Sequence, residues 1–169
     1  MTKSNKASNQ NITANNAVKG TSTSQAMRII KAGSCSTISG KSSLQYHIAC
    51  NDEGAIYLRV SSNNGGGFFN PEWVAYTAIV TALEATDAIT SPVLTGVFQG
   101  RSSNNPAFLM SVLLQEGIVV AHPEQQRAYQ LVDTRLFTES MQRLIQSDID
   151  IKDELASDDM PSFIETKAT

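Results

Sequence analysis

The spacing of apolar residues changes period twice along this chain of 169 residues, and no other feature constrains the fold as strongly. Residues 44–50 and 55–61 alternate apolar and polar positions, as strands do, and the link between them offers Gly54 for a turn. From about residue 71 the apolar spacing becomes helical, and after Gly117 it becomes strand-like again. The sequence therefore predicts an α+β fold in which a hairpin precedes a group of helices.

Three pairs of a polar residue followed by proline mark the expected helix starts. Asn70-Pro71, Ser91-Pro92 and Asn105-Pro106 each join a favoured N-cap residue to a residue favoured in the first helical turn. The predicted elements are a strand near 27–33, the hairpin of 44–50 and 55–61, helices over about 71–86, 92–98 and 106–116, a second hairpin of 118–122 and 127–132, and a last helix over about 134–146.

The order helix, short helix, helix and hairpin over residues 71–132 is the order of a winged helix. The stretch LLQEGIVVAHPEQQRAYQLV, residues 113–132, follows this pattern most closely. The predicted fold class is α+β, with an N-terminal antiparallel β-hairpin layer packed against a winged-helix-like helical half. Residues 25–147 are expected to form this single domain, and residues 71–147 its winged-helix-like part.

The two ends of the chain are polar and opposite in charge, although the formal net charge is only −3. Residues 1–32 carry five basic and no acidic side chains, whereas residues 148–169 carry seven acidic and two basic ones. Residues 1–24 have too little apolar surface to offset the entropy cost of ordering, so they are predicted to form a disordered basic arm. Residues 148–169 are predicted to be a disordered acidic tail. Each tail could recruit a partner, attract the other tail or simply be solvated.

The N-terminal sequence lacks the apolar segment of a secretory signal, and no apolar run is long enough to span a bilayer. We therefore expect a cytoplasmic protein with no membrane association. Cys35 and Cys50 are expected to be reduced thiols in that compartment.

Three consecutive glycines, Gly65, Gly66 and Gly67, stand before two phenylalanines and an expected helix start. Their backbone N–H groups could form an anion-binding nest beside the helix N-terminus. A structural corner that lets Phe68 and Phe69 pack onto the hairpin is the favoured interpretation, because glycine turns serve more often as corners than as sites. The two interpretations are compatible.

A second candidate site precedes the third predicted helix. Its side chains can donate hydrogen bonds to phosphate oxygens or base edges. Arg127 would join them from the wing. The proposed nucleic-acid contacts are Arg101, Ser102, Ser103, Asn104, Asn105 and Arg127.

The third helix itself is poor in residues that could read DNA, because only Ser111, Gln115 and Glu116 are polar and none is basic. The net negative charge also disfavours binding to phosphates. A nucleic acid and a protein therefore remain equally open as the partner. The sequence leaves the oligomeric state open, with a homodimer as one option.

No catalytic or metal-binding signature is present in the sequence. Gly40-Lys41-Ser42 lacks the preceding glycine of a phosphate loop and is followed by a strand instead of a helix. His47 and His122 do not have zinc-ligand spacing with the two cysteines. We therefore expect a protein that is not an enzyme, with no catalytic residues, no metal and no cofactor.

Three stretches, SGKSSLQYHI, YLRVSSNNGGGFFNPEWV and VFQGRSSNNPAFLMSVLLQEGIV, resemble a group of small uncharacterised proteins from proteobacterial conjugative plasmids and integrated mobile elements. The resemblance covers about residues 30–145. It implies a cytoplasmic accessory protein of a mobile element, such as a transfer or maintenance regulator or an anti-defence inhibitor, and it implies no catalytic residue. The leading hypothesis is a non-enzymatic nucleic-acid-binding regulator or accessory protein. The alternative is a protein-interaction module, an inhibitor or adaptor that uses the apolar third helix and the acidic tail.

Overall fold

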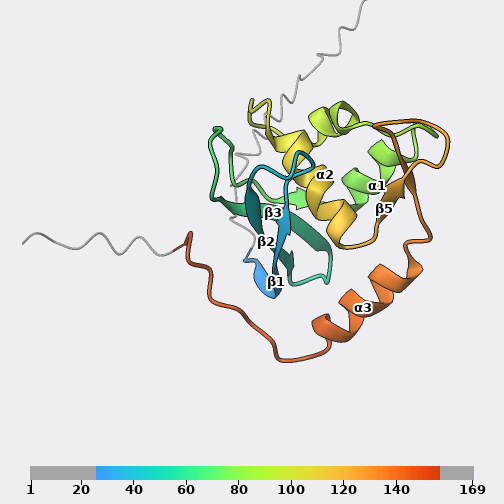
Figure 1. The fold of residues 1–169 in the computed structure, drawn as a ribbon. Helices are drawn as coiled ribbons and strands as arrows, with labels where there is room; N and C mark the ends of the chain where they lie inside the picture. Colours follow the sequence, from blue (N-terminus) through green and yellow to red (C-terminus); the bar gives the residue numbers. More distant parts are fainter. Residues whose placement is uncertain (1–25, 157–169) are drawn as a thin grey trace, which may run out of the picture.

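The computed structural model describes residues 26–156 and confirms an α+β architecture (Figure 1). A four-stranded antiparallel sheet has the order β1-β2-β3-β4, and a separate two-stranded sheet pairs β5 with β6. The elements are β1 (Arg28–Ser36), β2 (Ser43–Cys50), β3 (Ile56–Asn63), β4 (Val74–Ala75), α1 (Tyr76–Leu83), the 3₁₀ helix η1 (Ser91–Val97), α2 (Asn105–Gln115), β5 (Val119–Ala121), β6 (Tyr129–Leu131) and α3 (Arg135–Ile145).

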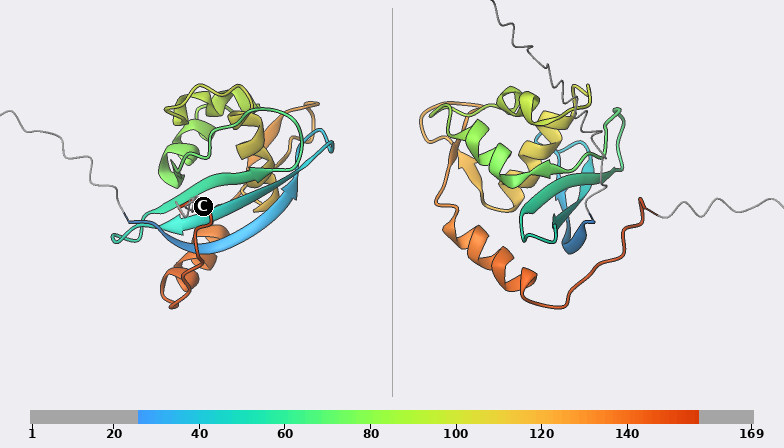
Figure 2. Two further views of the ribbon diagram at one scale, coloured as in Figure 1. Left: turned by 90° about the vertical axis from the view of Figure 1, so that its left-hand side faces the viewer. Right: turned by 180° about the vertical axis from the view of Figure 1, so that it is seen from behind.

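The alternation predicted for the hairpin is confirmed by the way β2 and β3 bury one face. We call this face, which carries Leu58 and Val60, the inner face, and the face that carries His47 and Arg59 the outer face. Figure 2 shows α1, η1 and α2 gathered over one face of the sheet, with α3 set apart from them. Helix α2 packs against both the sheet and η1, so it is apolar around most of its circumference and is largely buried.

The β5–β6 hairpin has a third segment that the sequence did not predict. Ile89, between α1 and η1, donates its N–H to the carbonyl of Tyr129 (2.9 Å) and accepts a hydrogen bond from the N–H of Tyr129 (2.8 Å). This bridge joins the α1–η1 connection to β6. The helical half and the second hairpin are therefore one packed unit.

The first helix begins later than the sequence predicts. Residues 71–73 are not helical, Val74 and Ala75 pair with β3 as β4, and α1 starts at Tyr76. The Asn70-Pro71 signal was read as a helix start, but pairing with β3 keeps the chain extended until residue 75. Local capping preference is overruled here by a contact between segments.

Part of the predicted acidic tail packs against the sheet. We call residues 149–156 the strap. Ile151 donates its N–H to the carbonyl of Ile29 (2.9 Å), and Asp153 forms an ion pair with Arg59 of β3. The prediction of a disordered tail from residue 148 is therefore wrong for residues 148–156, because composition alone could not show that these side chains have partners. The left view of Figure 2 shows the strap crossing the sheet.

The predicted basic arm, residues 1–24, lies outside the described residues, as do residues 157–169 of the predicted tail. Across residues 26–156, no helix combines the length and apolar character that crossing a membrane requires.

Candidate functional site

Three loops meet at one end of the four-stranded sheet, and we call this region the loop end. They are the β1–β2 turn (37–42), the glycine loop between β3 and β4 (64–70) and the pre-α2 loop (99–104). The first two share an end because β1 and β3, the strands that they follow, are each antiparallel to β2 and so run in the same direction. The loop end therefore unites both candidate sites that the sequence singled out.

The carbonyl oxygen of Phe68 joins the glycine loop to the pre-α2 loop. It accepts hydrogen bonds from Ser102 Oγ (3.0 Å) and Asn104 Nδ2 (2.7 Å). Gly67 has φ 111°, and a Cβ there would lie 3.0 Å from Asn104 Nδ2. Glycine is therefore required at this position both for its backbone angle and for close packing.

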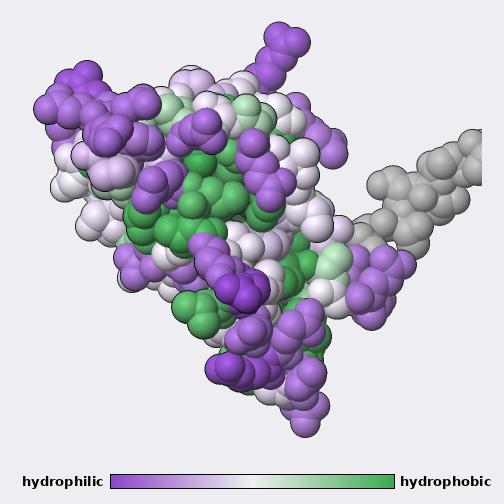
Figure 3. All heavy atoms as spheres, turned by 90° about the vertical axis from the view of Figure 1, so that its right-hand side faces the viewer, coloured by the Kyte–Doolittle hydropathy of each residue, from purple (hydrophilic) through white to green (hydrophobic). Residues whose placement is uncertain are grey.

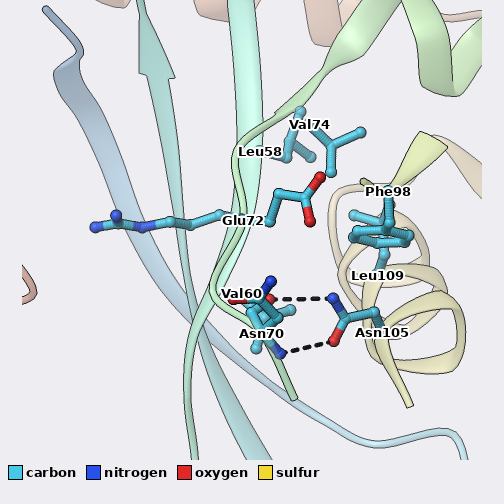
Figure 4. A pocket seen from close by; sticks show the side chains of 9 residues that line it. Leu58, Val60, Asn70, Glu72, Val74, Phe98, Asn105 and Leu109 are labelled. Atoms are coloured by element: carbon cyan, nitrogen blue, oxygen red, sulfur yellow. Dashed lines mark hydrogen bonds between the residues drawn. The ribbon is translucent and has the colours of Figure 1, made fainter. Parts of the chain in front are cut away.

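Asn105 is enclosed below these contacts, and both polar atoms of its side chain have partners. Its side chain accepts from the N–H of Asn70 (3.0 Å) and donates to the carbonyl of Asn70 (3.1 Å), as Figure 4 shows. Asn105 is 3% exposed. The structure therefore gives it a role in holding the loops together, whereas the sequence suggested contact with nucleic acid.

Glu72 fixes the start of the pre-α2 loop. Its carboxylate accepts hydrogen bonds from the backbone N–H groups of Gln99 and Gly100. The cavity in Figure 4, which Glu72 and Asn105 line, measures about 10 Å³. That volume suits one water at most, so the cavity is not a site for a larger ligand.

A larger groove opens on the surface of the loop end, with a volume of about 580 Å³. Lys41 and Ser39 of the β1–β2 turn, Gly65 and Gly66 of the glycine loop, and Asn104 are among its lining residues. This volume lies within the usual range for ligand pockets. The groove thus combines a cation, hydroxyl groups and backbone amides along one surface.

The predicted glycine nest is only partly available. The N–H of Gly65 donates to Asn63 Oδ1 (3.0 Å), whereas Gly66 and Gly67 do not donate theirs to another described residue. Both residues are exposed and Gly66 lines the groove, so two neighbouring amides have no partner among the described residues.

The two phenylalanines after the glycines differ in burial. Phe69 packs edge-on against Phe108 of α2, with 6.1 Å between ring centroids. Phe68 is 77% exposed. The prediction that both rings pack into the core is confirmed for Phe69 and wrong for Phe68, because the bonds to the Phe68 carbonyl orient the backbone so that only the following ring points inward.

The other predicted nucleic-acid contacts divide between two places. Arg101 and Ser103 are exposed in the pre-α2 loop. Arg127 is exposed in the β5–β6 turn, where it has φ 62°. Figures 1 and 2 place the pre-α2 loop and the β5–β6 turn at opposite ends of the helical layer. The structure therefore does not combine Arg127 with the loop end.

A second polar cluster lies on the inner side of the sheet near the end of α2. The Tyr46 hydroxyl donates to Glu116, and Lys31 Nζ lies 2.7 Å from the same carboxylate. Burial, and then Glu116, raise the pKa values of Tyr46 and Cys35. Both Cys35 and Cys50 are free and buried. This cluster stabilises the junction of β1, β2 and α2.

Among residues 26–156 there is no group of three or more His, Cys, Asp or Glu side chains positioned to hold a metal ion. Lys41 and Phe68 are the residues of the loop end that the sequence interpretation missed. Lys41 was considered only as part of a phosphate loop, and Phe68 only as a core residue.

Comparison of the chain with protein-family models, with curated proteins and with solved structures finds no significant match.

Proposed function

We propose that the protein is a non-enzymatic nucleic-acid-binding accessory protein that contacts single-stranded nucleic acid with its loop end. The observation that carries this proposal is the convergence of the three loops. Their hydrogen bonds fix the backbone of exposed Phe68 beside the pre-α2 loop, next to a groove that contains Lys41.

The chemistry of the loop end suits an unpaired strand. An exposed aromatic ring can stack on a base of any sequence, at about 1–3 kcal/mol per base. Lys41, Arg101 and the free amides of Gly66 and Gly67 can bind phosphate oxygens. Glu72, the carboxylate that holds the start of the pre-α2 loop, already accepts two backbone hydrogen bonds, which reduces its repulsion of a phosphate.

The burial of α2 argues against reading of duplex DNA. A recognition helix must enter the major groove with its side chains exposed. Helix α2 lies under the sheet instead, and its buried residues include Phe108, Met110 and Val112. A strand whose bases are already accessible does not need such a helix.

We retain a winged-helix-like description of residues 71–147 as part of the proposal. The element order supports it, and so does the bridge from Ile89 to Tyr129, which gives the β5–β6 hairpin the third segment of a winged domain. In this proposal the winged part is a scaffold whose third helix is covered by the N-terminal sheet. The resemblance over residues 30–145 supports a cytoplasmic role in a mobile genetic element.

Fluorescence anisotropy with a labelled oligothymidylate of about 20 nucleotides, measured across a salt series, tests the proposal. Phe68→Ala should weaken binding about fivefold or more. Leu136→Ala is the matched control, because Leu136 is also a large apolar residue, 79% exposed, in α3. Equal effects of the two substitutions would contradict stacking at the loop end.

Charge-removing variants locate the phosphate contacts. Lys41→Ala and Arg101→Ala should each reduce the slope of log affinity against log salt by about 0.7. Arg143→Ala, an exposed cation of α3, should leave the slope unchanged. Arg127→Ala tests whether the wing also contacts the oligonucleotide. The substitution should weaken binding only if the β5–β6 turn is part of the interface.

A protein-interaction module, such as an inhibitor or adaptor, is the second candidate. Figure 3 shows apolar residues gathered on the face that bears β5 and α3, where Val120 and Leu136 are exposed. Apolar patches on a surface commonly mark contacts with proteins. This candidate predicts no oligonucleotide binding at low salt, and that result would replace the first proposal.

A further inference from the structure

Arg59 lies on the outer face of the sheet, where its guanidinium is held in a fixed position. The residue is 7% exposed, and its guanidinium carbon lies 4.2 Å from the centre of the Trp73 ring. Its Nη2 atom lies 3.1 Å from His47 Nδ1. Among the described residues, its Nε is buried without a hydrogen-bond partner. A planar guanidinium stacked on an aromatic ring is well suited to bind a carboxylate.

The strap supplies that carboxylate. Asp153 forms an ion pair with Arg59 Nη2, and the N–H of Ile151 donates to the carbonyl of Ile29 in β1 (2.9 Å). Lys152, between them, is exposed. The outer face therefore recognises a short extended segment by one backbone contact at an apolar residue and by one acid two positions later.

Electrostatics reinforce the preference for an acid. Burial, and then the charge of Arg59, lower the pKa of His47, so this imidazole is neutral at physiological pH. Burial alone would raise the pKa of Asp153, but hydrogen bonds from Arg59 and from the N–H of Leu155, together with the charge of Arg59, lower it. Arg59 is then an enclosed cation that needs a carboxylate as its partner, because an enclosed charge without a partner destabilises the fold.

The strap is anchored firmly at its root and lightly beyond it. Arg28 donates to the carbonyls of Ile145 (2.7 Å), Ser147 (3.0 Å) and Ile149 (2.7 Å), which fixes the end of α3 and the first strap residue. Beyond that point, among the described residues, the polar contacts of the strap with the sheet are the backbone bond of Ile151 and the ion pair of Asp153. The distal strap can therefore separate from the sheet without unfolding α3.

We propose that the outer face around Arg59 is a receptor for an extended acidic peptide, and that the strap occupies it intramolecularly. A partner protein with an apolar residue, any residue and an aspartate in sequence binds there by displacing the strap. The clamp at Arg28 disfavours strap exchange between two copies, because a strap fixed at Ile149 on its own sheet can reach another copy only with its few distal residues, whereas a separate partner has no such tether. This inference does not depend on nucleic-acid binding at the loop end.

A labelled peptide of the strap sequence, SDIDIKDELA (residues 147–156), tests the proposal against the full-length protein. Asp153→Asn weakens the intramolecular competitor and should make the peptide bind about fivefold more tightly than to the wild type. Asp150→Asn is the matched control, since it removes the same charge from an exposed residue of the same segment. Its affinity for the peptide should equal that of the wild type.

Two readouts follow the binding. Anisotropy reports on the peptide, and the emission of Trp73, the single tryptophan of the chain, reports on the receptor. A peptide with asparagine in place of the aspartate equivalent to Asp153, directly after its lysine, should not bind detectably. Equal binding of the two peptides, or equal affinities of Asp153→Asn and Asp150→Asn, would overturn the proposal.

Further measurements distinguish a peptide from the other possible occupants of the outer face. If Asp153→Asn increases affinity for the oligothymidylate and not for the peptide, the face accepts nucleic acid and the peptide proposal is wrong. If sedimentation shows a wild-type dimer that Asp153→Asn abolishes, the occupant is the strap of a second copy. Lys41→Ala and Arg101→Ala should leave peptide binding unchanged. Failure of the nucleic-acid proposal can therefore be distinguished from failure of the peptide proposal.

Discussion

Asn105 and Asn70 form a reciprocal pair in which one side chain satisfies both backbone groups of the other residue. Asn105 accepts from the Asn70 N–H at 3.0 Å and donates to the Asn70 carbonyl at 3.1 Å. The pair ties the end of the glycine loop to the first turn of α2. The pair therefore connects the loop end to the core.

Replacement of Asn105 tests this connection. Asn105→Ala leaves the N–H of Asn70 without its partner and the Asn70 carbonyl with the N–H of Glu72 as its remaining donor, and we expect it to lower the free energy of unfolding by about 1–3 kcal/mol. Urea denaturation measures the loss. Ser103→Ala, at an exposed residue of the neighbouring loop, should change stability by less than about 0.5 kcal/mol. A similar small change in Asn105→Ala would contradict the role assigned to the pair.

Gly100 is required for close packing of the pre-α2 loop. A Cβ at this position would lie 2.4 Å from Asn70 Nδ2 and 3.2 Å from Glu72 Oε2. Gly100→Ala should destabilise the protein by about 1 kcal/mol, the low end of overpacking, because the exposed Asn70 side chain can shift but the Glu72 carboxylate that binds this loop is crowded. At Gly96 an added Cβ meets nothing within 4 Å, so Gly96→Ala should be neutral or stabilising by up to about 1 kcal/mol. Thermal unfolding of the two variants gives the comparison, and a reversed order would refute it.

Acid should weaken the attachment of the strap. The lowered pKa of His47 means that the unfolded chain takes up a proton first as pH falls below about 6.5, so stability declines from there. The lowered pKa of Asp153 contributes stability above its unfolded value of about 3.9, and this contribution is lost as pH falls through the folded pKa. Urea titrations from pH 7 to 3 should show the first loss and the beginning of the second, and Asp153→Asn should reduce the second. A profile unchanged in Asp153→Asn would count against the ion pair.

Tyr46 should stabilise the fold through the buried carboxylate of Glu116. The side chain of Glu116 is 5% exposed. It accepts a hydrogen bond from the Tyr46 hydroxyl and forms an ion pair with Lys31. Tyr46→Phe removes a hydrogen bond to a charged group and should lower stability by about 1.5–3 kcal/mol. A double-mutant cycle with Lys31→Met should show coupling, because both residues share one acceptor. Additive losses would mean that the two contacts act independently.

Local sequence pattern was sufficient for most of the secondary structure. The alternation of residues 44–50 and 55–61 predicted β2 and β3 closely, because a sheet with one buried face requires that period. The proline-marked starts near Ser91 and Asn105 were also confirmed. At Asn70 the same kind of signal failed, because β3 and Asn105 determine the backbone of the residues that follow.

The candidate site was only partly predictable. The glycine and Ser-Ser-Asn-Asn stretches were recognised from their turn-forming residues, but their meeting at the Phe68 carbonyl was not, because it joins segments more than thirty residues apart. A larger separation, 94 residues, hid the ion pair of Arg59 with Asp153.

The sequence by itself determined the order of strands and helices, since periodicity and turn chemistry act among neighbouring residues. Only the tertiary structure decided that α2 is buried, that Phe68 is exposed and Phe69 is not, and that an acidic strap covers Arg59. Each of these depends on which distant side chain supplies a hydrogen bond, a charge or an apolar contact. That information lies in the packing of the chain and is absent from any local pattern.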